Sequence, residues 1–291
     1  MSPGNSSPSE SKIKILVLET DEPHPETRDR KGSFGEIFHT LFSKAGDAHS
    51  PPLRVETNMR YVVDDPEKGN HGSVPHFSEI DTSISAIIIT GSMYDAHGDI
   101  PWVLKLLELL KSLWRERKDM KFSGVCFGHQ ILSRMLGATV ETTRGGKWEL
   151  AHTEMHLTPT GQKLFKTSQS TLSLHQMHQD QVTSIPSPQT SDLLTENDEE
   201  VEVWASTIHT PVQGLYMRER LFTSQGHLGF DEAMVQRQIE MRVDAGGITD
   251  TDGEKGKETA HLKHDGIIVA GAILRFFRCE DLHVKQVKGL S

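Results

Sequence analysis

The chain has 291 residues, with 31 basic and 41 acidic side chains and a formal charge of −10. This negative balance argues against a nucleic-acid backbone or an anionic membrane as the main partner. No apolar run reaches the roughly 18–20 residues that span a bilayer, and the first residues show no secretory pattern. The only cysteines, Cys126 and Cys279, cannot form a disulfide framework, so we expect a reducing, cytoplasmic location.

The first half of the sequence alternates apolar strand-like runs with amphipathic helical segments. Residues 1–11 are rich in Ser, Pro and Gly and are expected to be disordered, and residues 19–32 are expected to form a loop. Strands are predicted at 12–18, 53–63, 86–90 and 121–125, and helices at 33–45, 101–114 and 128–136. This alternation predicts an α/β fold, with a mostly parallel central sheet and helices on both faces.

The second half is predicted to contain short strands followed by two helices. The strand-like runs are 138–143, 150–157, 171–175, 201–206, 213–217 and 221–224, and the helices are 231–243 and 267–277. Residues 244–264 are rich in Gly and charged side chains, which predicts a flexible insertion. We expect residues 12–291 to form one domain.

The strongest chemical signal is the run Gly124-Val125-Cys126-Phe127-Gly128-His129-Gln130, which places a cysteine between a predicted strand and a predicted helix. It has the pattern of a nucleophile elbow with cysteine in place of serine. Glycines on both sides avoid steric collisions in a strained turn. The helix N-terminus favours thiolate over thiol, and the Phe127 N–H can stabilise an oxyanion. The alternative is a buried cysteine that packs as a small hydrophobic residue.

A cysteine nucleophile needs a base, and His227 is the best of 16 histidines by context. It ends a short predicted strand, follows Gly226 and precedes a predicted helix. It can therefore reach the carboxyl edge of the sheet, where catalytic groups gather in open α/β folds. His129 is too close to Cys126 in sequence and is expected to brace the turn.

Four motifs together resemble the class I glutamine amidotransferase superfamily. They are Thr90-Gly91-Ser92, Gly124–Gln130, His178-Gln179-Asp180-Gln181-Val182 and Gln225-Gly226-His227, and they occur in the order and at the spacing of the family. The resemblance covers roughly residues 12–243 and is greatest for stand-alone members, including γ-glutamyl peptidases. It implies the flavodoxin-like architecture of that superfamily.

The resemblance also implies a Cys-His-Glu triad that acts on a γ-glutamyl carbonyl. Cys126 would attack the carbonyl, His227 would take and return the proton, and the N–H groups of Phe127 and Gly91 would hold the oxyanion. The residues expected to bind the glutamyl head are Ser92, Gln130, His178, Gln179 and Asp180.

The sequence departs from the family pattern at the third triad position. The family usually reads Gly-His-Pro-Glu where this chain has Gly226-His227-Leu228-Gly229. The absent carboxylate would fix the tautomer and angle of the imidazole. Asp231 can replace it if a helix starts directly after His227, since the two residues would then share one helix face. The alternative is that Asp231 is an ordinary acidic residue in a first helical turn.

Three functional outcomes follow from this departure. The chain is an active γ-glutamyl hydrolase or transferase that forms a thioester on Cys126, a relative repurposed for another acyl, C–N or C–S step, or a non-catalytic binding module. Little sequence follows residue 243, which favours a stand-alone hydrolase of a small-molecule γ-glutamyl substrate over an ammonia donor. A homodimer stays open.

No cofactor or metal is expected. The spacings His175-x-x-His178 and His152-x-x-x-His156 suit a metal, but neither pair has a third ligand nearby in the sequence. No dinucleotide or ATP motif is present.

Overall fold

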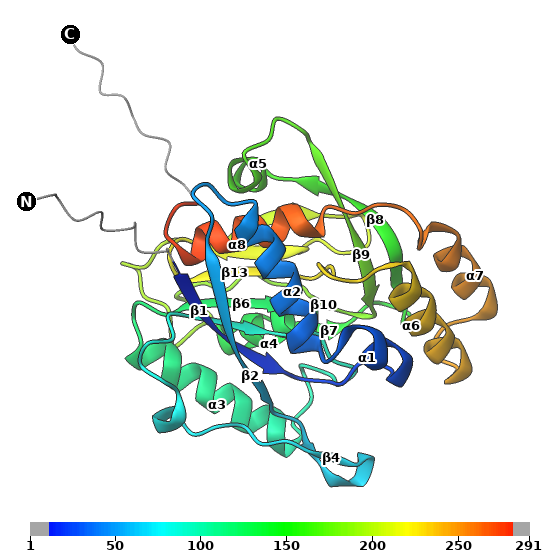
Figure 1. The fold of residues 1–291 in the computed structure, drawn as a ribbon, viewed down its shortest axis with the longest axis horizontal. Coiled ribbons are helices and arrows are strands. Elements are labelled where there is room, and N and C mark those ends of the chain that lie inside the picture. The colour runs from blue at the N-terminus through cyan, green and yellow to red at the C-terminus, as the bar shows by residue number, and fades with distance from the viewer. Residues whose placement is uncertain (1–11, 282–291) are drawn as a thin grey trace, which may run out of the picture.

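The computed structural model describes residues 12–281, and Figure 1 shows a twisted central sheet covered by helices. The nine strands of this sheet lie in the order β2-β1-β5-β6-β13-β12-β11-β8-β9. Neighbours from β2 to β13 pair in parallel, and neighbours from β13 to β9 pair antiparallel. The predicted α/β fold, a central sheet with helices on both faces, is confirmed. The predicted disorder of residues 1–11 lies outside the described residues.

The strands of this sheet are β1 (Lys12–Glu19), β2 (Arg54–Tyr61), β5 (Ala86–Ile89), β6 (Lys121–Val125), β8 (Glu149–Leu157), β9 (Thr171–His178), β11 (Glu202–Ser206), β12 (Gly214–Met217) and β13 (Leu221–Ser224). Two small antiparallel pairs accompany it, β3 (Asp64–Asp65) with β4 (Asn70–His71) and β7 (Val140–Thr142) with β10 (Asp180–Val182). The helices are α1 (Pro25–Lys31), α2 (Phe34–Asp47), α3 (Pro101–Glu116), α4 (Phe127–Met135), α5 (Pro159–Phe165), α6 (Glu232–Asp244), α7 (Asp250–Thr259) and α8 (Gly266–Phe277).

Strand β1 shows how the sheet divides two apolar cores. Its side chains alternate in direction, as they must in a strand. Leu16 and Leu18 pack in the cluster that contains α3 and α4, whereas Ile15 and Val17 pack with α2 and α8. Figure 1 shows these helix pairs on opposite faces of the sheet. Because both faces of β1 are buried, its sequence is an almost unbroken apolar run.

Three segments differ from the sequence expectation. The predicted loop 19–32 contains α1, which has Pro25 in its first turn. The predicted flexible insertion 244–264 contains α7, which contacts α6 and β8 and is followed by the buried Ala260. Helix α5 was not predicted. Each helix is short and carries few apolar side chains, so the helical period is hard to detect.

No helix within residues 12–281 is both long enough and apolar enough to cross a membrane.

The parallel pairing of β6 with β13 positions the candidate site. Ser224 at the end of β13 lies opposite Val125 at the end of β6. The chain leaves both strands at the same edge, with Cys126 directly after β6 and His227 three residues after β13. The sequence-based expectation that these two residues share one edge is confirmed.

Two glycines allow α4 to start directly against the sheet. A Cβ on Gly128 would lie 2.2 Å from the Ile89 carbonyl oxygen, and a Cβ on Gly124 would lie 2.3 Å from the backbone of Gly128. Both neighbours are backbone atoms, which cannot move aside without displacing the strand or the helix. The steric role predicted for these glycines is confirmed.

We expect Gly128→Ala to lower the free energy of unfolding by about 2 kcal/mol or more, because the added methyl group overpacks the contact with β5. Chemical denaturation of the variant and the wild type measures this difference. Gly271→Ala is the matched control, since Gly271 is also helical but a Cβ there meets only the Arg275 side chain at 3.7 Å. The control should be neutral or stabilising by up to about 1 kcal/mol. Equal stability of the two variants would contradict the account.

Candidate active site

Cys126 lies in a strained turn between β6 and α4. Its φ is +53° and its ψ is −108°, a conformation that residues other than glycine rarely adopt. Its N–H donates to the Ser224 carbonyl at 2.9 Å, and its carbonyl accepts from the Gln130 N–H at 3.0 Å. The backbone is thus fixed to β13 on one side and to α4 on the other. This is the geometry of a nucleophile elbow, with the thiol at the N-terminus of a helix.

His227 is fixed by one strand and one aromatic ring. Its N–H donates to the His175 carbonyl in β9 at 2.8 Å. Its imidazole stacks on Phe230, with ring centroids 3.8 Å apart and an interplanar angle of 15°. These contacts hold the ring plane even though no carboxylate lies at position 229.

Gly91 brings the thiol and the imidazole together. The position that a Cβ on Gly91 would occupy lies 3.0 Å from His227 Cε1, 3.7 Å from His227 Nδ1 and 3.5 Å from Cys126 Cβ. Both side chains therefore flank the same point, and a side chain at position 91 would push the imidazole aside. The glycine keeps this point open for a reacting group.

The two imidazole nitrogens of His227 have different surroundings. Nδ1 lies 3.7 Å from the position of a Cβ on Gly91, whereas Nε2 is buried and has no hydrogen-bond partner within residues 12–281. A buried polar atom without a partner is uncommon and costs free energy.

Asp231 does not contact His227. Helix α6 begins at Glu232, so the helix that the sequence analysis placed directly after His227 starts too late to align the two residues. One Asp231 carboxylate oxygen accepts from the Met234 N–H at 3.0 Å, and the other pairs with Lys31 at 2.7 Å. Asp231 is therefore a helix N-cap, which agrees with the alternative interpretation of this residue.

Burial leaves both reacting groups neutral. It raises the pKa of the Cys126 thiol to about 12, although the Phe127 N–H and the Arg242 charge act in the opposite direction. Burial, together with the charges of His178 and His175, lowers the pKa of His227 to about 3. The expected thiolate at the helix N-terminus is not the resting form, because desolvation outweighs the helix N-terminus. A neutral imidazole can still accept a proton.

The two predicted oxyanion donors lie at the thiol. The Phe127 N–H forms a hydrogen bond that stabilises the thiolate, so it points toward the sulfur. No described residue accepts a hydrogen bond from the Gly91 N–H, and Gly91 packs against Cys126 and His227. Backbone N–H groups fixed in this way can stabilise negative charge that develops on a carbonyl oxygen.

A pocket next to Cys126 is lined by all five residues that the sequence analysis expects to bind the substrate. Several already have partners. The Ser92 hydroxyl donates to the Thr20 carbonyl at 2.6 Å, and the Gln130 amide donates to the Asp180 carbonyl at 2.9 Å. Gln179 donates to the Gly146 carbonyl at 2.7 Å. We call this pocket the polar arm. Its lining residues are Ser92, Met93, Tyr94, Asp95, Cys126, Gln130, Trp148, Met177, His178, Gln179, Asp180 and Arg242.

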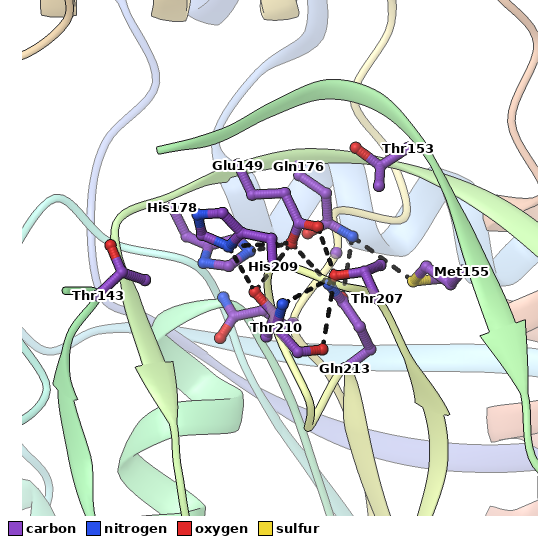
Figure 2. Close-up of polar contacts among 12 residues, drawn as sticks. Thr143, Glu149, Thr153, Met155, Gln176, His178, Thr207, His209, Thr210 and Gln213 are labelled. Carbon is purple, nitrogen blue, oxygen red and sulfur yellow. Dashed lines mark hydrogen bonds and ion pairs between the residues drawn. The ribbon is translucent and has the colours of Figure 1, made fainter. Parts of the chain in front are cut away.

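His178 lines the polar arm, and both of its ring nitrogens lie close to oxygen atoms of other residues. Its Nδ1 lies 2.9 Å from the Asp180 carbonyl and its Nε2 lies 2.9 Å from the Glu149 carboxylate, as Figure 2 shows for the second contact. Both partners can accept hydrogen bonds, so the ring is held between them. Burial is the main cause that lowers the pKa of His227, and interaction with His178 adds to it.

Glu149 is buried and was not identified from the sequence. Its carboxylate accepts from Thr207 at 2.6 Å, Thr210 at 3.0 Å and Gln213 at 2.6 Å, in addition to His178 (Figure 2). Burial opposes ionisation, but the hydrogen bonds and charges of His178, Thr207 and His209 lower the pKa of Glu149. A fully hydrogen-bonded buried carboxylate of this kind fixes His178 at the end of β9.

Arg242 is the main functional candidate that the sequence analysis missed. It lies on α6, lines the pocket at Cys126 and stacks over Trp148 with its guanidinium carbon 5.4 Å from the ring centroid. No described residue accepts a hydrogen bond from it, and its Nε is buried without a partner. Burial lowers its pKa, whereas the charges of Asp21 and Cys126 raise it. Since charged residues are common on surface helices, nothing in the sequence distinguishes this arginine.

One grouping within residues 12–281 has metal-ligand geometry, and it comprises Asp95, His97 and Asp180. The two histidine pairs weighed from the sequence are not part of it. His178 already uses both ring nitrogens, and His152 Nε2 lies 3.0 Å from the Lys263 carbonyl.

The comparison with family models identifies residues 71–234 as matching the glutamine amidotransferase class-I family. This span includes Gly91, Cys126 and His227 and more than half of the chain. The chain belongs to this family.

Individual relatives support this assignment to the class-I glutamine amidotransferase family. A glutamine amidotransferase-like protein of Schizosaccharomyces pombe is 26% identical over 262 residues, which cover 90% of this chain and 97% of the relative. Gamma-glutamyl peptidase 3 of Arabidopsis thaliana is 24% identical over 73% of this chain and 76% of its own. A glutamine amidotransferase of Thermotoga maritima shares the fold, with a TM-score of 0.63 at 17% identity over 91% of this chain and 98% of that chain.

Alkylation with iodoacetamide tests the resting state of the amidotransferase-like site. In a Cys279→Ser variant, which leaves one thiol, the labelling rate of Cys126 should rise about tenfold per pH unit between about pH 7 and 9, because the buried thiol is neutral there. The exposed Cys279 in a Cys126→Ser variant is the control. A Cys126 rate that is already fast and constant at neutral pH would contradict the structure, since it would indicate a thiolate.

Proposed function

We propose that this chain hydrolyses a γ-glutamyl amide or peptide through a thioester on Cys126. The observation that carries the proposal is the placement of the Cys126 thiol and the His227 imidazole around one open point at Gly91. Family membership and the γ-glutamyl peptidase relative support a γ-glutamyl substrate. The proposal includes a reducing, cytoplasmic setting, because the nucleophile is a free thiol.

The polar arm offers complementary groups for the glutamyl head. The Arg242 side chain has no acceptor among residues 12–281 and can pair with the α-carboxylate of the substrate. Asp180 lines the same arm, and its carboxylate, which accepts from Thr142 at 2.7 Å and lies 3.3 Å from His97 Nε2, can also accept from the α-ammonium group. With both ends of the head held, the γ-carbonyl extends toward Cys126.

The chemical steps follow from two neutral groups. As the sulfur attacks the γ-carbonyl, His227 takes the thiol proton, and the N–H groups of Phe127 and Gly91 stabilise the oxyanion. Collapse of this intermediate breaks the C–N bond, and the imidazolium returns the proton to the leaving amine. Water then attacks the thioester, with His227 as base, and releases glutamate and the free thiol.

Turnover without a triad carboxylate should be slower than in a complete triad. Loss of that carboxylate costs roughly 10⁴ in a serine protease, where it sets the tautomer of the base. Here the Phe230 stack and the backbone bond to His175 set the ring orientation, but no residue in the described part of the chain forms a hydrogen bond with Nε2. A non-catalytic binding module and a repurposed enzyme are the alternatives, and the unpartnered Nε2 is the observation that favours them.

Kinetics with γ-glutamylglycine test the assigned head contacts. Arg242→Gln should raise KM about tenfold or more with a smaller change in kcat, because it removes a charge-assisted contact to the bound substrate. Arg237→Gln on the same helix is the matched control, since Arg237 pairs with Glu26 and Glu240 away from the pocket. Cys126→Ala should abolish turnover.

Two results would contradict the proposal. Equal effects of Arg242→Gln and Arg237→Gln would remove Arg242 from the substrate site. Unchanged release of glutamate in Cys126→Ala, or no release from any γ-glutamyl compound by the wild type, would favour the alternatives.

A further inference from the structure

A second arm of the pocket opens on the other side of Cys126 and is mainly apolar. Helix α2 contributes Phe34, Ile37, Phe38 and Leu41 to its wall, and the turn after His227 faces them. We name this cavity the apolar arm. The sulfur lies at its junction with the polar arm, because Cys126 lines both. A bound substrate that extends into both arms therefore has one end in a polar environment and the other end in an apolar environment.

Gly229 keeps the apolar arm open. A Cβ at this position would lie 3.1 Å from Ile37 Cγ2 and 3.9 Å from Leu41 Cδ2, so any side chain here projects toward the α2 wall of the arm. Gly229 also lines the cavity itself. The residue at which the chain departs from the family motif is therefore a residue that leaves space next to the nucleophile.

The charged groups of the apolar arm disfavour an acidic ligand. They are Asp21, Glu22 and Arg242. The Asp21 carboxylate accepts from the Met93 N–H at 2.6 Å and from the Glu22 N–H at 2.8 Å, while burial raises its pKa above the ordinary value. Glu22 pairs with Arg28 at 2.6 Å. Arg242 is shared with the polar arm, where the proposed function assigns it to the α-carboxylate. A carboxylate that enters the apolar arm would meet apolar side chains and Asp21, and would gain no cation from Arg28, which already pairs with Glu22.

The size of the arm limits the apolar group that it can hold. Its cavity volume is about 50 Å³, compared with about 230 Å³ for the polar arm. A single water molecule needs roughly 10–15 Å³ of cavity volume, so the apolar arm has room for a few water molecules. This is room for a branched alkyl group or one small ring.

We infer that the preferred substrates are γ-glutamyl amides of small apolar amines that carry no carboxylate, with the amine portion in the apolar arm. This inference rests on the proposed function and names the leaving group for the same site. In the acylation step the bond between the γ-carbon and nitrogen breaks, the γ-carbon bonds to Cys126 sulfur, and the amine leaves with the proton that His227 took from the thiol. Hydrolysis of the thioester gives glutamate, so the products are glutamate and the free amine.

The test compares kcat/KM for γ-glutamylisobutylamide and γ-glutamylglycine, with glutamate release as the readout. The isobutylamide should be preferred about tenfold or more, the range that one apolar group in a pocket provides. Gly229→Leu fills the arm and should reduce this ratio about tenfold. Gly271→Leu is the matched control, because it adds the same side chain on α8, where a Cβ meets only the Arg275 side chain at 3.7 Å. It should leave the ratio unchanged.

Binding to a Cys126→Ala protein separates this inference from the proposed function. Calorimetry should show tighter binding of γ-glutamylisobutylamide than of γ-glutamylglycine, and Gly229→Leu in the same background should remove the difference. If binding shows this pattern while the wild type hydrolyses neither compound, the inferred ligand class stands and the proposed hydrolysis fails. If hydrolysis occurs but γ-glutamylglycine is used or bound equally well, or if Gly229→Leu leaves the ratio unchanged, the inference is overturned.

Discussion

The close approach of α4 to the backbone of β5 is the constraint on which the site depends. Gly124 and Gly128 make this approach sterically feasible, and it forces Cys126 between them into a backbone conformation with φ of +53°. Such strain persists only where surrounding contacts impose it, and here the hydrogen bonds of Cys126 to Ser224 and Gln130 do so. The turn places Cys126 at the sheet edge, where Cys126 and the His227 imidazole flank Gly91.

Burial then determines the chemistry that this geometry can perform. The same low-dielectric surroundings raise the pKa of the thiol and lower that of the imidazole, so neither carries a charge at rest. Interaction with His178, which lies against the Glu149 carboxylate, adds to this lowering of the His227 pKa (Figure 2). The proposed hydrolysis therefore depends on a proton transfer that coincides with attack on the substrate, rather than on a preformed thiolate.

Much of this architecture could be predicted from sequence because it depends on local patterns. Apolar runs fix the buried strands, and the Gly-x-Cys-x-Gly spacing reports a steric requirement at the turn. The shared edge of Cys126 and His227 follows from the general rule for parallel strands. Short helices such as α7, with few apolar residues, lack a clear period and were missed.

The contacts that complete the site depend on tertiary placement and could not be predicted in the same way. Arg242 and Glu149 are ordinary charged residues in the sequence. Only the packed structure leaves the Arg242 side chain without an acceptor among the described residues. The same packing surrounds the Glu149 carboxylate with hydrogen-bond partners. Asp231 was misplaced because α6 begins at Glu232, with Asp231 as its N-cap. The pKa of Cys126 was expected to be low because a helix N-terminus is visible in sequence, whereas the degree of burial is not.

The central claim, that Cys126 is the nucleophile at this edge of the sheet, is tested most directly by trapping the acyl-enzyme. The protein is mixed with a γ-glutamyl amide, quenched in acid after a short interval and analysed by mass spectrometry, intact and after digestion. The account predicts a mass increase of one glutamyl group on the peptide that contains Cys126, longer-lived in a His227→Ala protein if it acylates at all. An unmodified Cys126 under conditions where glutamate is being released, or an adduct on another residue, would contradict it.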